Sequence, residues 1–387
     1  MAEAYIVEAL RTAGGRARKG GLTGVHPADI GAAVLNALVE RSGVDPAAVE
    51  DVIVGCVSQA GEQAFAFGRN LVLASELPDS VPAVTIDRQC GSSQQALQFA
   101  AQAVMSGTQD IVIAAGAESM TRVPMGSNFT LHAQAGIGEG PWPASIRERY
   151  GVSEFSQFHG AQMIADKYGF SREAMDAFAL DSHRKATAAI ETEAFRSEIV
   201  PVRTAGGVFD TDDGVRIGGT MEAMASVRPL TEGGTITAAN ASQMTDGASG
   251  ALVVSETAIK RFNLTPIARI VNLTVTAGDP VIMLEEPIPA TRKALARAGM
   301  KLDEIDLFEV NEAFASIPMA WLQALGADPA KLNVNGGAIA LGHPLGATGT
   351  KLMSTLIHAL QARGGRYGLQ TMCEGGGISN VTIVERL

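Results

Sequence analysis

Blocks of apolar and polar residues along this chain predict helices that alternate with buried strands. Residues 27–48 have the pattern of a helix that ends at Gly43, and residues 51–55 form the apolar run of a strand. The same order returns much later, with a helix within residues 289–304 and a strand over residues 306–310. This recurrence predicts a chain built from similar units.

A second pair of segments carries residues suited to chemistry. Residues 83–86 predict a buried strand with Cys90 at its end, followed by a helix and a strand over residues 110–114. Later in the chain, His343 precedes another helix and a strand over residues 367–372. Both helices repeat apolar residues with the 3.6-residue period. The first has Ala96, Leu97, Ala100, Ala101, Val104 and Met105 and ends at Gly107; the second has Leu352, Met353, Leu356, Ile357 and Leu360 and ends near Gly364.

This alternation implies a fold class and a relation between the two segments. Strands that alternate with helices imply mostly parallel sheets covered by helices, and two such halves imply a duplication. Cys90 and His343 then occupy corresponding strand-to-helix junctions. Because ligands gather at the carboxyl ends of strands, the two residues would face each other if the halves pack about a pseudo-twofold axis. The alternative is that two unrelated α/β units share one rhythm.

A different stretch, residues 117–246, separates the two halves. Its first part, residues 120–158, contains Pro-Trp-Pro and several glycines and is predicted to be a loop. Helical segments follow, such as residues 171–195, which Ser171 would cap. An insertion of this length commonly covers a binding site.

Composition narrows the class of protein. The chain has 387 residues, 46% of them hydrophobic, which suits two or three domains with large cores. Thirty Lys and Arg against 41 Asp and Glu give a net charge of −11, so we expect no nucleic-acid partner, and an anionic ligand needs a local basic site. Three cysteines without zinc spacing argue for a reducing compartment and against a metal site. Without a signal-like start or a long apolar run, we expect a cytoplasmic protein with no membrane insertion.

The densest chemical signal is the run Asn-Val-Asn-Gly-Gly-Ala-Ile-Ala-Leu-Gly-His-Pro-Leu-Gly-Ala-Thr-Gly, which begins at Asn333. It holds His343 in a glycine-rich turn before a helix, whose N-terminus offers free N–H groups and a positive dipole end. Cys90 lies in a related setting, Asp-Arg-Gln-Cys-Gly-Ser-Ser. A thiolate suits acyl exchange between thiols, and His343 is the candidate base for its proton. The plainer alternatives are a small buried cysteine and a structural histidine.

Two further residues extend this candidate site. Cys373 ends a strand and begins a triple-glycine turn, whose N–H groups can bind an oxyanion. Its thiol could carry a proton to or from carbon, and an incidental strand-end cysteine is the alternative. Asn311 follows the strand over residues 307–310 and could orient a water or an oxyanion, although an N-cap for the next helix explains it equally well.

Together these motifs resemble those of the thiolase family, the 3-ketoacyl-CoA thiolases and acetyl-CoA acetyltransferases. The resemblance covers essentially the whole chain. Besides the four motifs above, it includes Ile-Val-Glu-Ala-Leu-Arg-Thr from Ile6, Gly-Ala-Glu-Ser-Met-Thr-Arg-Val-Pro-Met from Gly116, Thr-Ala-Ala-Asn-Ala-Ser from Thr237 and Asp-Gly-Ala from Asp246.

The resemblance implies a five-layer αβαβα fold of two duplicated halves with an inserted loop domain. The N-terminal half is then residues 1–116 with 247–265, the loop domain over the coenzyme A (CoA) site is residues 117–246, and the C-terminal half is residues 266–387. It further implies no permanently bound cofactor, CoA as co-substrate, 3-ketoacyl-CoA esters as substrates, and a homodimer or homotetramer.

The resemblance also implies a role for each catalytic residue. Cys90 carries the acyl group, His343 activates it, and Cys373 protonates the acetyl-CoA enolate and deprotonates incoming CoA. Asn311 holds a water that forms one oxyanion hole with His343. The backbone N–H groups of Cys90 and Gly375 form the other.

For CoA binding, the resemblance aligns Ser242 with a serine near the pantetheine and Arg216 with an arginine near the adenine. Phe314 aligns with the aromatic residue of the asparagine motif. Several positions depart from the family pattern, namely Ser93-Gln94 after the nucleophile, Leu284-Glu285-Glu286-Pro287 after Met283, Phe158-His159, and Ala223. None belongs to the reacting groups, and the departures favour a broad or bulky acyl group.

These matches imply a degradative 3-ketoacyl-CoA thiolase with ping-pong kinetics, which yields acetyl-CoA and a shortened acyl-CoA and can run the reverse Claisen condensation. One alternative is a biosynthetic acetyl-CoA acetyltransferase that forms acetoacetyl-CoA. A decarboxylating ketoacyl synthase of the same fold is another, and Cys373 argues against it. The alternative of a different class is a non-catalytic protein that binds CoA esters or lipids.

Overall fold

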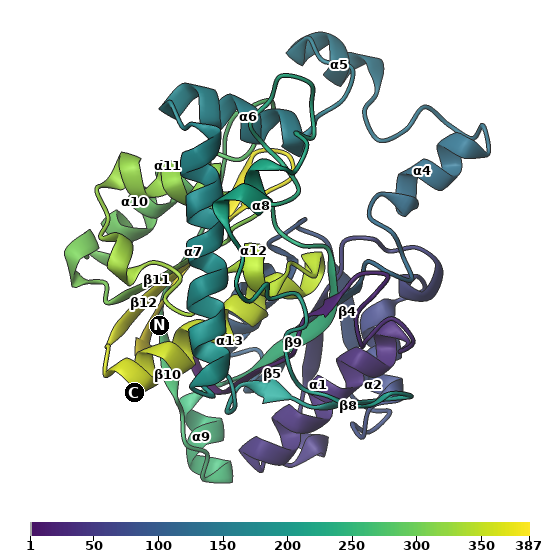
Figure 1. Cartoon of the computed structure of the whole chain (residues 1–387). Coiled ribbons are helices and arrows are strands. Elements are labelled where there is room, and N and C mark those ends of the chain that lie inside the picture. The colour runs from purple at the N-terminus through teal and green to yellow at the C-terminus, as the bar shows by residue number, and fades with distance from the viewer. Residues whose placement is uncertain (1) are drawn as a thin grey trace.

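The computed structural model describes residues 2–387 and is centred on two helices (Figure 1). These helices, α3 (Ser92–Ser106) and α13 (Thr348–Arg363), pack against each other between two halves of a sheet. Both end at a glycine in the left-handed conformation, Gly107 and Gly364, as the sequence predicts. Apolar residues of the two helices share one buried cluster, which includes Leu97, Val104, Leu356 and Leu360.

The two halves of the sheet have matching strand orders. The first half runs β4 (Ala83–Ile86), β3 (Asp51–Gly55), β5 (Ile111–Ser119), β9 (Thr245–Val254), β1 (Tyr5–Thr12). The second half runs β11 (Leu307–Val310), β12 (Tyr367–Glu374), β13 (Ile378–Arg386), β10 (Ala268–Ala277). The halves join where β1 pairs with β10, through Tyr5–Arg269 and Ile6–Ala268.

Strand directions also match between the halves. β3 is parallel to β5 as β11 is to β12, and the next two pairs in each half are antiparallel. The topology therefore shows the duplication that the sequence indicates. The prediction of mostly parallel sheets is wrong, because β13 returns directly from β12 through a glycine turn and a direct hairpin is antiparallel. In the first half, β9 takes the place of β13 and has the same direction.

Helices on both outer faces complete five layers. α1 (Pro27–Ser42) and α2 (Phe67–Ala74) cover the first half, and α10 (Pro287–Ala298) and α11 (Ser316–Leu325) cover the second. α1 ends at Gly43 as predicted. α10 begins two residues before the predicted segment, because a proline fits the first turn of a helix. The order of layers is the αβαβα arrangement of the thiolase fold.

The strand that would match β4 in the second half is reduced to one bridge, in which Leu332 pairs with Phe308. Beyond this bridge, the side chain of Asn333 takes the place of the backbone hydrogen bonds of a paired strand. Its Nδ2 donates to the carbonyl of Val310 and its Oδ1 accepts from the N–H of Val310, both at 2.9 Å. The short helix α12 (Ala338–Leu341) follows and leads to His343. The predicted strand-to-helix junction at His343 is thus wrong in detail, since a helix and not a strand precedes it.

The inserted segment is more helical than the sequence predicts. α4 (Ser127–Gln134) and α5 (Ala144–Tyr150) lie within the predicted loop and form an arm that extends from the body (Figure 1). Neither helix buries a residue, so no apolar period marks them in the sequence. α6 (Gln157–Tyr168) and α7 (Arg172–Glu191) pack on the second half, and Ser171 caps α7 as predicted. β6 (Ile199–Val200), β7 (Val202–Thr204), β8 (Gly207–Phe209) and α8 (Met221–Ala225) complete the segment.

β4 differs from the predicted buried strand. It lies at the edge of the sheet in residues 2–387, and Val84 is 46% exposed. Two small elements, β2 (Gly15–Arg16) and α9 (Glu256–Phe262), flank the first half. No helix in the described part of the chain is long and apolar enough to cross a membrane.

Candidate active site

Cys90 lies in the turn between β4 and α3, with its residue 9% exposed. The turn is held by the N–H of Arg88, which donates to Oγ of Ser92, and by the Ser92 hydroxyl, which donates to the carbonyl of Gln89. Burial, with the Glu374 carboxyl as the next cause, raises the pKa of Cys90 to about 12. At neutral pH the residue is therefore a thiol, and it needs a base at the moment of attack.

Cys373 comes from the other half of the sheet and lies next to Cys90. It is fully buried on β12, and burial followed by the proximity of Cys90 raises the pKa of its thiol well above the usual value. The turn after it touches the Cys90 turn, since a β-carbon on Gly375 would come within 2.9 Å of Oε1 of Gln89. The sulfurs of Cys90 and Cys373, which come from different halves of the sheet, are therefore neighbours.

His343 is held in one tautomer. Its Nδ1 lies 2.6 Å from Oγ1 of Thr348, and that hydroxyl donates to the carbonyl of Pro344 at 3.0 Å. Because the hydroxyl has one hydrogen, Nδ1 carries the shared proton and Nε2 keeps a lone pair. Burial, reinforced by the Lys351 ammonium, lowers the pKa of His343 to about 3, so the ring is neutral at pH 7. This is the state of a general base.

Asn311 lies directly beside His343. Its Nδ2 is 3.4 Å from Nε2 of His343, and its buried Oδ1 has no partner among residues 2–387. Its backbone N–H donates to the carbonyl of Thr371 at 3.1 Å, two residues before Cys373. The N-cap alternative is wrong, because α11 begins at Ser316 with Ala315 as its N-cap.

Packing joins the cysteine pair to the histidine pair. Cys90 shares a small apolar cluster with Met372, which precedes Cys373, and with Leu345, which lies two residues after His343. The segments that carry the four predicted catalytic side chains therefore meet at the boundary between the sheet halves.

Glycines in the His343 turn act mainly through close packing. A β-carbon on Gly346 would press on Gly55 and Cys56 of the first half, and one on Gly349 would overlap the backbone of Gln94 in α3. Among the glycines of residues 342–349, only Gly342 has a positive φ, 82°. These contacts let the turn of one half dock on the other.

Sequence reasoning missed two residues that hold this site. Oε2 of Glu118, at the end of β5, accepts from the N–H groups of Val57 and Gly346, and so ties the first half to the His343 turn. Gln243 accepts the N–H of His343 at its carbonyl, and its Nε2 donates to the carbonyl of Ile339. Glu118 had a signal, a carboxylate after an apolar strand, whereas nothing in the sequence marks Gln243.

The predicted CoA-binding residues lie in two places. The N–H of Ser242 donates to the carbonyl of Ala313, and the preceding residue pairs with Phe314, whose ring packs edge-on against Phe158. Arg216 is separate and exposed. It lines a surface hollow of about 560 Å³ along α7, where its N–H donates to Nδ1 of His183. Burial, with Arg216 as the second cause, lowers the pKa of His183 to about 4.

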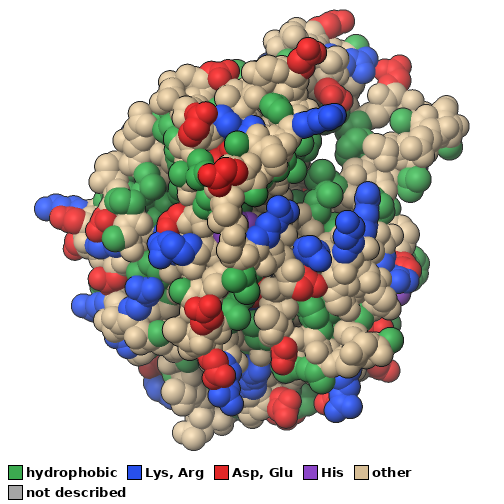
Figure 2. All heavy atoms as spheres, viewed as in Figure 1, with side chains coloured by type: hydrophobic (Ala, Val, Ile, Leu, Met, Phe, Trp, Pro, Cys, Tyr) green, Lys and Arg blue, Asp and Glu red, His purple; other side chains and the backbone are tan. Residues whose placement is uncertain are grey.

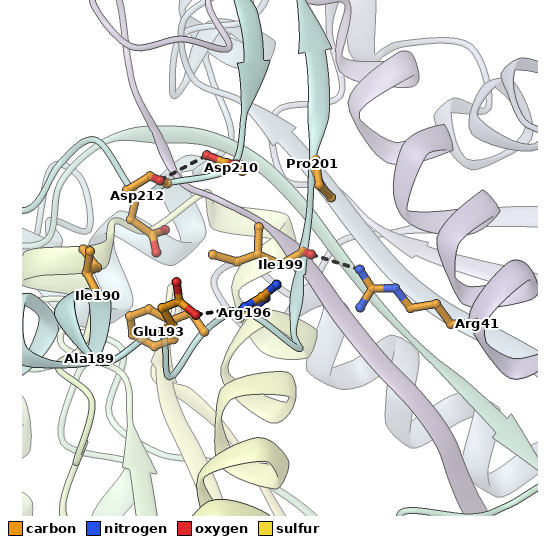
Figure 3. A pocket seen from close by; sticks show the side chains of 11 residues that line it. Arg41, Ala189, Ile190, Glu193, Arg196, Ile199, Pro201, Asp210 and Asp212 are labelled. Atoms are coloured by element: carbon orange, nitrogen blue, oxygen red, sulfur yellow. Dashed lines mark hydrogen bonds and ion pairs between the residues drawn. The ribbon is translucent and has the colours of Figure 1, made fainter.

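Another hollow, of about 510 Å³, lies between the C-terminal end of α1 and residues 189–212 (Figure 3). Its guanidinium groups are engaged within the protein, since Arg41 donates to the carbonyl of Ile199 and Arg196 pairs with Glu193. None of the predicted site residues lines it. Residues 2–387 also contain no group of three or more His, Cys, Asp or Glu arranged to hold a metal ion.

Comparison with known proteins agrees with this arrangement. The family model of the thiolase N-terminal domain matches residues 4–257, and that of the thiolase C-terminal domain matches residues 264–386. The steroid 3-ketoacyl-CoA thiolase FadA6 of Mycobacterium tuberculosis is 53% identical over 389 residues, covering 100% of this chain and 95% of that protein. The 3-ketoacyl-CoA thiolases of Bacillus subtilis and Marinobacter nauticus are 40% and 39% identical, each covering 100% of this chain and at least 98% of its own length. This chain belongs to the thiolase family.

Proposed function

We propose that this protein is a 3-ketoacyl-CoA thiolase, which uses CoA to cleave a 3-ketoacyl-CoA ester into acetyl-CoA and a shortened acyl-CoA. The observation that carries the proposal is the neighbouring pair Cys90 and Cys373, supplied by different halves, with the His343–Asn311 pair packed beside it. One thiol can hold the acyl group while the other handles protons.

In the first step, Nε2 of His343 takes the proton of Cys90 as the sulfur attacks the 3-keto carbon. The oxyanion that forms on the former 3-keto oxygen is received by the backbone N–H groups of Cys90 and Gly375, while protonated His343 and a water held on Asn311 stabilise the CoA thioester oxygen that becomes the enolate oxygen. The C2–C3 bond then breaks, and its electron pair forms the acetyl-CoA enolate, which takes a proton from Cys373. The acyl group remains on Cys90 as a thioester.

In the second step, the Cys373 thiolate takes the proton of the CoA thiol. The CoA sulfur attacks the thioester, whose oxyanion is received by the backbone N–H groups of Cys90 and Gly375. Cys90 leaves and regains its proton from His343. All groups return to their starting state. Because acetyl-CoA leaves the acyl-enzyme before CoA binds, the reaction follows ping-pong kinetics, and both steps can run in reverse.

CoA is proposed to bind under the inserted segment. The net charge of the chain is −11, so the phosphates need a local basic site. Arg184 and Arg216 both line the hollow along α7, and Lys and Arg side chains gather below the opening between the arm and the body (Figure 2). Ser242 and Phe314 are the proposed neighbours of the pantetheine, between this hollow and the catalytic pairs.

For the acyl chain we propose a bulky or broad class. The departures from the family pattern favour this class, and one of them, Phe158, packs its ring on Phe314. The FadA6 relative at 53% identity is named for steroid 3-ketoacyl-CoA esters, which supports the same class. The competing proposal is biosynthetic formation of acetoacetyl-CoA.

A thiolysis panel tests the proposal. Acetoacetyl, long-chain and sterol-side-chain 3-ketoacyl-CoA esters are each offered with CoA, and acetyl-CoA release is measured. We expect the highest kcat/KM for a bulky ester and parallel lines in double-reciprocal plots. A preference for acetoacetyl-CoA would support the biosynthetic enzyme, and no turnover of any ester would support a non-catalytic CoA-ester-binding protein.

Three further properties are part of the proposal. We assign residues 1–116 with 247–265 to the N-terminal half, 117–246 to the loop domain and 266–387 to the C-terminal half. We propose a homodimer or homotetramer, which the uncovered edge at β4 and the exposed Phe65 beside it favour. We propose a cytoplasmic location, which the free thiols of Cys56, Cys90 and Cys373 favour.

A further inference from the structure

Glu374 is a buried carboxyl in the active site that the proposed reaction does not use. It follows Cys373 on β12 and is 0% exposed. Its Oε1 accepts the N–H of Asn380 at 3.1 Å, while its Oε2 has no partner among residues 2–387. A buried carboxylate with an unpaired oxygen is costly, so this side chain calls for an explanation.

The carboxyl lies against the turn that carries the nucleophile. A β-carbon added to Gly91 would overlap Oε1 of Glu374, so the side chain fills the space that only a glycine leaves open. Gly91 is the N-cap of α3, and no side chain caps that helix end. Glu374 thus lies at the N-terminus of a 15-residue helix.

Such a helix end favours one negative charge, because its free N–H groups and dipole are positive. Cys90 immediately precedes the N-cap, so the same end would favour its thiolate. Each group opposes ionisation of the other, since the Glu374 charge raises the pKa of Cys90. Burial raises the pKa of Glu374 well above its usual value.

Few other charged groups face this pair. Arg88 and Asp87, on the same turn, act on Glu374 in opposite directions. Cys90 and Glu374 both raise the pKa of Cys373 on β12. Asp87 on the turn and Glu118 on β5 also raise the pKa of Cys90. No cation in the described chain forms an ion pair with Glu374. The two acids therefore compete for one favourable environment.

We propose that Glu374 is a positioning residue that controls where the negative charge of the site lies. Its carboxyl and the Cys90 thiol share the N-terminus of α3, and only one of them is ionised at a time. This inference rests on the proposed function, in which Cys90 is the nucleophile. While Glu374 is neutral, the helix end is available to the attacking sulfur. While Cys90 carries an acyl group and has no charge, the helix end is available to Glu374.

The test is the pH dependence of Cys90 alkylation by iodoacetamide between pH 6 and pH 10, followed by peptide mass spectrometry. Two acids that share one charge titrate as a pair. The wild-type rate should rise with pH and then level off once the pair has lost the first of its two protons. In Glu374→Gln the rate should continue to rise, and should exceed the wild-type rate by about tenfold at pH 10, the effect of about one pKa unit.

Glutamine keeps an oxygen for the Asn380 N–H and adds a donor, so the fold should persist. Asp79→Asn is the control, because it removes an exposed carboxyl from the loop before β4 that acts on neither Cys90 nor Glu374. It should follow the wild-type profile within about twofold. If Glu374→Gln does not fold, the levelling of the wild-type profile alone decides.

The possible outcomes separate this inference from the proposed function. Profiles of wild type and Glu374→Gln that keep a constant ratio, or a wild-type rate that rises without levelling up to pH 10, would overturn the shared charge but leave Cys90 as a reactive nucleophile. No alkylation of Cys90 at any pH in either protein would overturn both proposals.

Discussion

The Cys90 turn and the His343 turn occupy the same place in the two halves of the sheet but are built differently. Cys90 follows a four-residue edge strand, and α3 begins two residues later. His343 follows a single bridge at Leu332, the side-chain ladder of Asn333, and α12. The Cys90 junction is short and follows the edge strand of the sheet, whereas the His343 junction is longer.

The difference matches what each residue has to do. A nucleophilic sulfur must be held in a fixed place close to a helix N-terminus, which favours the thiolate. The short turn at Cys90 meets both requirements. A base needs a fixed tautomer and a neutral ring, and the longer turn supplies Thr348 for Nδ1 and burial for neutrality. With the proposed roles, duplication supplied one scaffold, and divergence of the two junctions separated the nucleophile from the base.

Removing the nucleophile has the largest expected effect. Cys90→Ala should abolish the acyl-enzyme and lower kcat by at least about 10³-fold, because no other group in the site can form the thioester. Steady-state thiolysis measures this. Cys56→Ala, at a buried cysteine after β3 without an assigned role, is the control and should keep activity within about threefold. Comparable loss in both variants would contradict the assignment.

Removing the second thiol should split the reaction. Cys373→Ala should still load an acyl group onto Cys90 from an acyl-CoA, while cleavage of the C2–C3 bond falls about 10²–10⁴-fold for lack of its acid. Radiolabelled acyl transfer reports loading, and acetyl-CoA release reports cleavage. Equal loss of both activities would argue against this division of labour.

Replacing His343 tests whether its buried turn supplies the base. His343→Gln should lower kcat/KM about 10²–10⁴-fold, since Nε2 takes the proton of Cys90. His358→Gln, on the helix α13 that follows the His343 turn and bonded to the carbonyl of Ser354, is the control and should stay within about threefold. An active His343→Gln enzyme would show that another group is the base.

A stability effect tests the structural side of the comparison. Asn333→Ala removes the side-chain bonds to Val310 in a fully buried setting, so we expect a loss of about 2–4 kcal/mol in the free energy of unfolding. Urea denaturation measures it. Asn263 has a positive φ, as Asn333 does, but its side chain is exposed. The control Asn263→Ala should therefore lower the free energy of unfolding by about 1 kcal/mol. Equal losses would mean that backbone strain alone matters.

The smallest expected effect is on the pH profile. The pKa of His343 is lowered to about 3, so its base form persists as pH falls from 8 to 6, and the Cys90 thiol with a pKa of about 12 does not titrate there either. kcat/KM should change by no more than about twofold over this range. An acid limb with an apparent pKa near 6.5 would show that the histidine is not shielded.

Sequence predicted the parts of the fold that carry a regular period. α1, α3 and α13 have long apolar faces and glycines at their ends, so their positions followed from the pattern. α4 and α5 bury nothing and left no such signal. The side chain of Asn333 makes the two hydrogen bonds to Val310 that a neighbouring strand would otherwise make. A single side chain of this kind leaves no periodic pattern in the sequence.

The site was predictable to the extent that rare residue types stood in glycine-rich turns. Cys90, His343 and Cys373 were predicted that way, and the matched strand order brings their segments together. Thr348 and Gln243 are common polar residues whose role depends on the tertiary contacts of the ring. Glu374 resembles a surface residue in sequence, and only its burial against Gly91 gives it meaning.

The central claim is that a sulfur of one half and an imidazole of the other act as one unit. Its most direct test is rapid-quench mass spectrometry of the acyl-enzyme, with a 3-ketoacyl-CoA ester and no free CoA. Wild type should gain one acyl group on the Cys90 peptide within the first turnover, and folded His343→Gln should gain it at least about 10²-fold more slowly. Equal rates in the two proteins, or an acyl group on any other residue, would contradict the account.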